Sequence, residues 1–240
     1  MKFLKSLLLV SSIAASAIQP ANSAEEYDPF EKRNRKIFDF NDYLDRTFFV
    51  PVAKGYNYVT PVVVDRGITN MYDNALDPLT TVNDVAQLKF KRALTATGRF
   101  IVNSTVGFFG FFDVATHIGL PKHREDFGQT LGYWGVGNGP YLMLPFFGPR
   151  TLRHTVGHGG DYMTGLSYTY FGENLGEDAM LFGLKALDLR SDLIDSEKFI
   201  TGDRYLFIRS AYLQHREYEV NDGKTEDEFD DEFGIFDEEF

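Results

Sequence analysis

The fold of this chain is decided first by residues 28–49, DPFEKRNRKIFDFNDYLDRTFF. Apolar side chains recur there at helical spacing, at Phe30, Ile37, Phe40, Leu44 and Phe48. Asp28 and Pro29 stand where an N-cap residue and a first-turn proline would precede such a helix. The segment therefore predicts an amphipathic helix that begins near Asp28 and has a continuous apolar stripe.

Further helices are expected downstream of this segment. Pro51 and Pro61 each resemble a first-turn proline that opens a short helix, and Pro78 is expected to open a third. In this third helix Val82, Val85, Leu88 and Leu94 would form one side, and Lys89, Lys91 and Arg92 the other. Helical periodicity returns after Asn174 and again between Asp203 and Arg216.

The middle of the chain lacks this regularity. Residues 128–149 contain six glycines and three prolines, which exclude a long regular element. Residues 106–112, VGFFGFF, combine four aromatic rings with two glycines, so a buried strand, a loop and a broken helix are all possible there. Neither an internal repeat nor a β-α-β spacing is visible. The sequence predicts one mostly α domain with an irregular Gly/Pro-rich middle segment.

The first 24 residues are typical of a secretory signal peptide. Lys2 and Lys5 supply positive charge, residues 7–18 are apolar or small, and small residues precede Glu25. The apolar run is shorter than the roughly 20 residues that span a bilayer, and no later window reaches that length. We therefore expect an exported chain with a signal peptide at 1–24, a folded domain at 25–220 and a tail at 221–240.

Charge and cysteine content narrow the possible functions. The formal net charge is −11, and residues 222–240 hold ten carboxylates against one lysine. Nucleic acid is a poor candidate partner because its phosphates require a basic protein face. The chain has no cysteine, which excludes disulfides, thiolate metal sites and an acylated lipobox cysteine. The acidic tail carries phenylalanines at helical steps, so it is either a solvated tail or a helix that folds on a partner.

Residues with obvious chemical roles are few. A serine nucleophile elbow fails at Ser167, since Thr169 stands where the second glycine is required. His154 and His158 have the spacing of metal ligands on a helix, with Asp161 near them, but no glutamate adjoins either histidine.

Two carboxylate pairs could act as acid and base: Asp126 with Asp161, or Glu125 with Asp126. No reactive serine or histidine dyad accompanies them in the sequence. We expect no cofactor, no metal and no catalysis; a periplasmic lipid hydrolase and an envelope scaffold protein are the alternatives.

Nine short motifs stand out along the chain. In chain order they are Asp28-Pro-Phe-Glu31, Asn34-Arg35, Phe38-Asp-Phe-Asn41, Arg99-Phe100, Asn103-Ser-Thr105, Gly110-Phe-Phe-Asp-Val-Ala115, Asp126-Phe-Gly-Gln-Thr-Leu-Gly132, Gly135-Val-Gly-Asn-Gly-Pro-Tyr141 and Leu144-Pro145. Together they resemble the MlaA (VacJ) family. The resemblance covers roughly residues 27–220. Two positions depart from the family pattern: His154 replaces an aspartate, and Arg204 replaces a proline.

The resemblance implies a ring-shaped α-helical protein in the inner leaflet of the Gram-negative outer membrane. Such proteins remove mislocalised phospholipid from the outer leaflet through an amphipathic channel. They associate with outer-membrane porin trimers and pass the lipid to a periplasmic lipid-carrier protein, without a cofactor. We therefore expect this chain at the periplasmic face of the outer membrane, without a lipobox cysteine anchor.

Three sets of residues are expected at the functional site. Phe108, Phe109, Phe111 and Phe112 would contact lipid tails or gate the channel, or else pack in the core. Gly135, Gly137, Gly139, Pro140 and Tyr141 would line or hinge the channel, or else make turns. Asn34, Asn41, Arg99 and Asn103 match family positions and would face a polar lumen or make structural hydrogen bonds.

Overall fold

The computed structural model describes residues 28–166, 175–194, 197, 200 and 202–224. In chain order its elements are α2 (Glu31–Leu44), the π-helical segment η1 (Asp45–Phe49), α3 (Val50–Val59), α4 (Val62–Ala86), α5 (Phe90–Thr105), α6 (Val114–His117), α7 (Phe127–Tyr133), β1 (Tyr141–Leu144), β2 (Gly148–Thr151), α8 (Leu152–Met163), α9 (Leu175–Leu193) and α10 (Arg204–Val220). The expected signal peptide, Ser167 and nearly all of the acidic tail lie outside the described residues.

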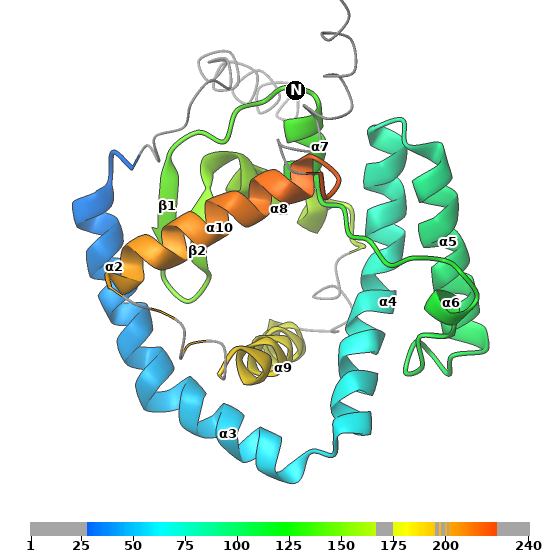
Figure 1. The fold of residues 1–240 in the computed structure, drawn as a ribbon, viewed down its shortest axis with the longest axis horizontal. Helices are drawn as coiled ribbons and strands as arrows, with labels where there is room; N and C mark the ends of the chain where they lie inside the picture. Colours follow the sequence, from blue (N-terminus) through cyan, green and yellow to red (C-terminus); the bar gives the residue numbers. More distant parts are fainter. Residues whose placement is uncertain (1–27, 167–174, 195–196, 198–199, 201, 225–240) are drawn as a thin grey trace, which may run out of the picture.

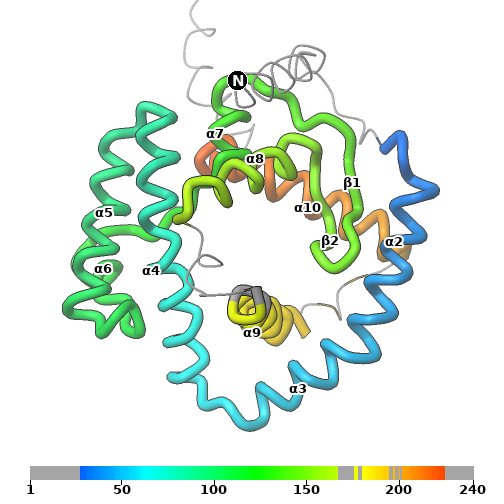
Figure 2. Tube along the Cα trace, turned by 180° about the vertical axis from the view of Figure 1, so that it is seen from behind, coloured from blue at the N-terminus to red at the C-terminus, as the bar shows by residue number. Residues whose placement is uncertain are grey.

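The helices form a ring, as Figures 1 and 2 show from opposite sides. The blue-to-cyan arc of α2, η1 and α3 makes one side, and α4 runs up the other with α5 packed along its outer flank. The β-hairpin, α7, α8 and α10 close the ring, while α9 lies inside it and packs against α3 and α4. The mostly α, ring-shaped architecture is therefore confirmed.

Pro51 and Pro61 each stand at the start of a helix, as expected, but the helix that follows Pro61 is long (25 residues) and not short. Pro51 lies in the first turn of α3, and Pro61 is the N-cap residue of α4. Thr60, immediately before Pro61, is extended (φ −95°, ψ 116°), because a proline ring disfavours helical geometry in the preceding residue. The chain thus turns a corner between α3 and α4.

The expected helix start at Pro78 is wrong. Pro78 lies inside α4, which continues through it to Ala86 and packs along α5. The actual break comes ten residues later, where Leu88 adopts a left-handed conformation (φ 62°). Lys89 N–H donates to Asp84 O at 2.8 Å and Leu88 N–H to Val85 O at 3.0 Å, which is a Schellman ending without glycine.

The expected N-cap at Asp28 is also displaced. α2 begins at Glu31 with Phe30 as the N-cap residue, and Phe30 provides no side-chain cap. Asp28 instead accepts a hydrogen bond from Phe30 N–H at 3.2 Å, in the manner of an Asx turn. The side-chain amide of Asn34 also donates to Asp28, at 2.8 Å.

The Gly/Pro-rich middle contains a short hairpin that the sequence did not predict. β1 pairs antiparallel with β2, from Tyr141 opposite Thr151 to Leu144 opposite Gly148. The free edge of β1 faces α2, where Asn34 donates to Tyr141 O (3.1 Å) and accepts from Met143 N–H (3.0 Å). Two helical turns on, Asn41 makes the equivalent pair with Leu144 O and Phe146 N–H. These amides complete the edge strand's hydrogen bonds, which explains two asparagines seven residues apart.

Candidate functional site

The burial of apolar and polar residues is the reverse of that in an ordinary globular protein. Among the described residues, 21 polar or charged residues are buried but only eight apolar ones, four of them alanines. Exposed large apolar side chains number 38 in the same set. Ordinary globular proteins bury their large apolar residues and expose their charges. The exposed surface of the described residues is therefore suited to an apolar neighbour, and the buried contacts between the elements are largely polar.

The helix inside the ring shows this reversal on its own. On α9 the buried side chains are Lys185, Asp188 and Ser191. Lys185 pairs with Asp188 at 2.9 Å, and Thr69 of α4 donates to the same carboxylate at 3.0 Å. Met180, Leu184, Leu189 and Leu193 are exposed on the same helix.

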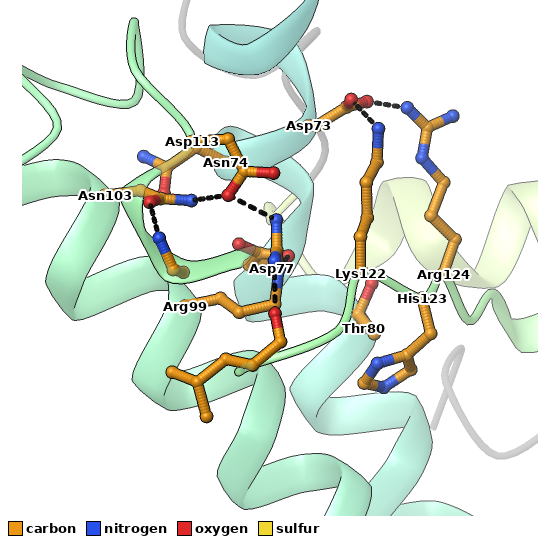
Figure 3. A network of polar contacts seen from close by, with 12 residues as sticks. Asp73, Asn74, Asp77, Thr80, Arg99, Asn103, Asp113, Lys122, His123 and Arg124 are labelled. Carbon is orange, nitrogen blue, oxygen red and sulfur yellow. Dashed lines mark hydrogen bonds and ion pairs between the residues drawn. The ribbon is translucent and has the colours of Figure 1, made fainter. Parts of the chain in front are cut away.

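A first polar network joins α4, α5 and the segment before α6 (Figure 3). Arg99 pairs with Asp113 at 3.1 Å and donates to Leu120 O at 2.7 Å, and Asn103 donates to Asp113 at 3.1 Å. Burial disfavours ionisation of Asp113, but hydrogen bonds from Thr116 and Asn103 lower its pKa to about 2. Of the four polar residues expected at the site, Arg99 and Asn103 thus meet here, whereas Asn34 and Asn41 lie at the hairpin.

A carboxylate pair on α4 extends this network in Figure 3. Asp73 is bound by both Lys122 and Arg124. One turn further on, burial raises the pKa of Asp77 to about 6, and the charge of Arg99 opposes that rise. None of Asp73, Asp77 and Lys122 was expected from the sequence, because a charged residue in an amphipathic pattern is normally assigned to the solvent face.

A second polar network joins α7, α8 and α10. Arg216 donates to both carboxylate oxygens of Asp126 through its two terminal nitrogens, Nη1 and Nη2, at 2.8 and 3.0 Å. Burial opposes ionisation of Asp126, but the contact with Arg216 lowers its pKa to about 2. Burial, assisted by the charge of Arg216, lowers the pKa of His154 to about 3. Burial and the charge of Asp126 raise the pKa of Asp161 to about 6, although Asn83 and Phe127 N–H both donate to this carboxylate.

Three of the groups considered for catalysis or metal binding, His154, Asp126 and Asp161, make structural contacts here. His154 Nδ1 is 2.6 Å from the Tyr212 hydroxyl, and its Nε2 faces Asp126 at 3.9 Å, so both ring nitrogens face other side chains of the described residues. Asp161 caps the chain at Phe127. Within the described residues, no three His, Asp or Glu side chains gather closely enough to hold a metal ion.

The aromatic segment forms a tight turn with outward rings, which we call the aromatic turn (residues 107–112). Phe108 and Phe109 both have left-handed backbones, at φ 53° and 56°, and are 68% and 71% exposed. Phe112 is 53% exposed, whereas the ring of Phe111 packs where a side chain on Gly67 would stand. Non-glycine residues rarely adopt positive φ, and the conformation costs about 1 kcal/mol or more each. Two aromatic side chains are therefore held exposed by a strained backbone conformation.

The glycine segment lies between α7 and β1. Gly135 and Gly139 have positive φ, at 85° and 66°, and Gly137 lies in the irregular chain between them. Tyr141 is 1% exposed, and its ring contacts those of Tyr205 and Tyr212 in the small apolar core. Tyr141 thus packs in the core, next to Pro140; a channel or hinge role for this segment stays a prediction.

The junction of α7 with α4 carries the single tryptophan of the sequence. Trp134 donates its indole N–H to Ala86 O at 3.1 Å, while its ring is 58% exposed. None of the helices in the described part of the chain is both long and apolar enough to cross a membrane.

The comparisons with known proteins agree with this geometry. The family described as MlaA lipoprotein matches residues 26–219. The intermembrane phospholipid transport system lipoprotein MlaA of Escherichia coli (strain K12) is 32% identical over 227 residues, which cover 90% of this chain and 86% of that protein. Its namesake from Haemophilus influenzae is 31% identical, with 90% of each chain covered.

Other relatives and a solved structure extend the likeness. The uncharacterized protein RP093 of Rickettsia prowazekii is 43% identical over 129 residues, so the match to such relatives spans only about half their length (51%). A solved structure described as "Structural basis for maintenance of bacterial outer membrane lipid asymmetry" is 32% identical, with a TM-score of 0.73, and covers 81% of this chain and 100% of its own. The ring fold, the matched span and these identities together place the chain in the MlaA lipoprotein family.

Proposed function

We propose that this protein carries out intermembrane phospholipid transport. It would remove mislocalised phospholipid from the outer leaflet of the outer membrane through an amphipathic channel and pass it to a periplasmic carrier. The observation that carries the proposal is the reversed distribution: among the described residues, 21 polar or charged residues are buried and 38 large apolar side chains are exposed. The names of the Escherichia coli and Haemophilus influenzae relatives support it.

The physical requirements of lipid transfer match this arrangement. A phosphate head group crosses an apolar region at high cost unless polar groups accompany it. Each CH₂ of an acyl chain that is left in water costs roughly 0.8 kcal/mol. A protein with exposed apolar side chains and a polar path for the head group would meet both requirements at once, because tails can stay in the leaflet while the head group passes.

The same features support a position at the periplasmic face of the outer membrane. Exposed apolar side chains of α3 and α4, such as Tyr58, Val62 and Val63, and the aromatic turn would lie in the inner leaflet. An outer-membrane porin trimer would cover part of the remaining apolar surface. No step of this transfer breaks a bond, so we propose a transport component and not an enzyme.

The proposed roles of individual residues follow from their positions. Phe108, Phe109 and Phe112 would contact lipid tails, since three of the four phenylalanines project outward. Gly135, Gly137 and Gly139 would give the chain before β1 its close turns beside the transfer path. Asn34, Asn41, Arg99 and Asn103 would hold the ring together through the hydrogen bonds described above.

The test is the outer-leaflet phospholipid content of cells that lack the protein. Head-group labelling should rise in the deletion strain and fall again when the wild-type chain is expressed. An unchanged level, with the strain and expression verified, would overturn the proposal. Lysophospholipid should be quantified in the same extracts, because its loss in the deletion strain would favour a lipid hydrolase instead.

A further inference from the structure

A surface cavity of about 360 Å³ lies between α4 and the aromatic turn, at the edge of the first polar network, which contributes Asp113 to its wall. The residues that line it include the apolar Val63, Gly67 and Phe112 and the basic Arg66 and His117. In Figures 1 and 2, α5 and α6 lie on the outer flank of α4, away from the interior of the ring. The volume falls within the range of small-molecule sites, about 300–1,000 Å³.

The charge at this cavity is unbalanced and positive. Arg66 is exposed on α4, and no hydrogen bond or ion pair joins its guanidinium to another residue in the described part of the chain. The one carboxylate in the wall, Asp113, is already bound by Arg99 at 3.1 Å. Histidine adds no donor when neutral, because His117 Nδ1 must donate to Asp113 O (2.8 Å) and Nε2 then carries no proton. Arg66 is therefore the group that would meet an anion.

The apolar wall is held in place by contacts that leave little freedom. The ring of Phe111 lies 2.1 Å from the position that a Cβ on Gly67 would take, so only glycine admits this packing. Asn70 donates to Phe111 O at 3.2 Å, which ties the aromatic turn to α4. A preformed apolar wall beside a single free guanidinium suits an amphiphile with one anionic group.

We propose that this cavity binds one phospholipid molecule, with an acyl chain along Val63 and Phe112 and the phosphate on Arg66. Charge complementarity and the exposed rings of Phe108 and Phe109 next to the cavity favour a lipid over a peptide as the occupant. This inference rests on the proposed lipid-handling function, but it assigns a separate site on the outer flank of the ring, where a lipid would be held beside the protein and not transferred.

The test uses the full chain in vesicles of phosphatidylcholine that contain a diazirine-tailed phosphatidylglycerol. Photolysis followed by mass spectrometry should place the label on residues 60–70 and 108–118. Val63→Trp fills the cavity, and Val62→Trp is its matched control at a neighbouring exposed position that is not in the wall. Labelling should fall severalfold in the first variant and stay near wild type in the second.

The contribution of the phosphate is tested by competition. Dodecyl phosphate should displace the label at a concentration roughly fivefold lower than dodecanol, a difference of the size expected for one partly exposed charged contact. Arg66→Gln should erase that difference, whereas Arg33→Gln, which makes the same charge change on α2, should preserve it. Equal competition by both compounds in the wild-type chain would overturn the phosphate contact.

The outcomes separate this site from the proposed function. Label absent from both segments, in a chain that still lowers outer-leaflet phospholipid in cells, would overturn the cavity proposal alone. Cross-linking of a photoreactive residue at position 63 to a protein and never to lipid would also overturn it. A deletion strain with unchanged outer-leaflet phospholipid would remove the transport function regardless of the label.

Discussion

The Asp126–Arg216 contact and the aromatic turn break the ordinary burial rule in opposite directions. At the first, charged groups lie inside the protein, and both terminal nitrogens of the guanidinium donate to the carboxylate. At the second, rings that would normally build a core are 68% and 71% exposed. The first region is complete as it stands, because each charge has its partner. The second is incomplete, because large apolar rings in water need a cover that the described residues do not supply.

The Asp126–Arg216 contact stabilises the folded chain, whereas the aromatic turn presents apolar surface to a lipid or a partner. A buried ion pair contributes little net stability over an apolar pair, but removing one partner leaves a charge without compensation. An exposed ring contributes little to the folded chain, and gains free energy only when lipid or a partner covers it. Substitutions in the two regions should therefore affect stability and membrane binding independently.

The largest effect on stability is expected for Arg216→Ala. Loss of the guanidinium leaves the Asp126 carboxylate unpaired in a largely buried site, which should lower the free energy of unfolding by about 3 kcal/mol. Urea unfolding followed by circular dichroism measures this change. Arg46→Ala is the matched control, since Arg46 pairs with Asp42 at 2.8 Å but is 61% exposed. The control should cost less than about 1 kcal/mol; equal losses would contradict the assignment of Arg216 to the interior.

A smaller effect, dependent on pH, is expected for Asp161→Asn. The folded pKa of Asp161 is raised to about 6, from an ordinary value of 3.8. The folded state therefore binds this proton more tightly than the unfolded state, and the contribution of Asp161 to stability falls as pH rises from about 4 to 6. Asparagine keeps an oxygen acceptor for Phe127 N–H and does not ionise. Relative to wild type, the variant should gain about 1 to 2 kcal/mol between pH 4.5 and 7.

Melting temperatures at a series of pH values test this prediction. Asp126 acts in the opposite sense, since its lowered pKa gives stability that is present above about pH 4 and lost as pH falls toward 2. The variant should leave that acid limb unchanged. Parallel profiles for variant and wild type from pH 4 to 7 would contradict the charged, buried environment of Asp161.

The smallest change in stability is expected for the double substitution Phe108→Asn and Phe109→Asn. Asparagine tolerates the left-handed backbone better than phenylalanine, so the free energy of unfolding should stay within about 1 kcal/mol of wild type or rise. Binding to phospholipid vesicles should nevertheless weaken at least tenfold, because each buried ring is worth about 1.5–3 kcal/mol. Co-sedimentation with vesicles measures the loss.

Phe146→Asn is the matched comparison for the aromatic turn. Phe146 has φ 66° and is 67% exposed, but it lies at the tip of the hairpin. A weaker effect there would show that the aromatic turn is the main contact with lipid. An equal effect would extend the lipid-facing surface to the hairpin. No effect at either place would contradict the claim that lipid covers the exposed aromatic rings.

The sequence predicted the existence of the helices better than the residues at which they begin and end. Periodicity located α2, α9 and α10, and prolines located the start of α3 at Pro51 and the corner at Pro61. Pro78 was misplaced because packing along α5 tolerates a proline inside α4, and the break at Leu88 carries no glycine to mark it. The hairpin was missed because its strands have four residues each and lie among turn-forming residues.

The candidate site could be predicted only in part, for a related reason. The motif residues Asn34, Arg99 and Asn103 were found by resemblance, yet their partners depend on the tertiary fold. Pairs such as Arg216 with Asp126 are 90 positions apart, and no local pattern distinguishes a buried arginine from a solvated one. The burial of polar residues and the exposure of apolar ones depend on how the helices pack together, which the periodicity of a single helix cannot reveal.

The indole of Trp134 gives the protein an intrinsic fluorescent probe at a single position. This ring is the only tryptophan in the chain, its N–H is fixed on the Ala86 carbonyl, and more than half of it faces outward. Its emission therefore reports on one known point, the junction of α4 and α7, without a label or an added residue. A blue shift on mixing with vesicles, and quenching by lipids brominated at successive carbons, would measure how deeply that junction sits in the leaflet.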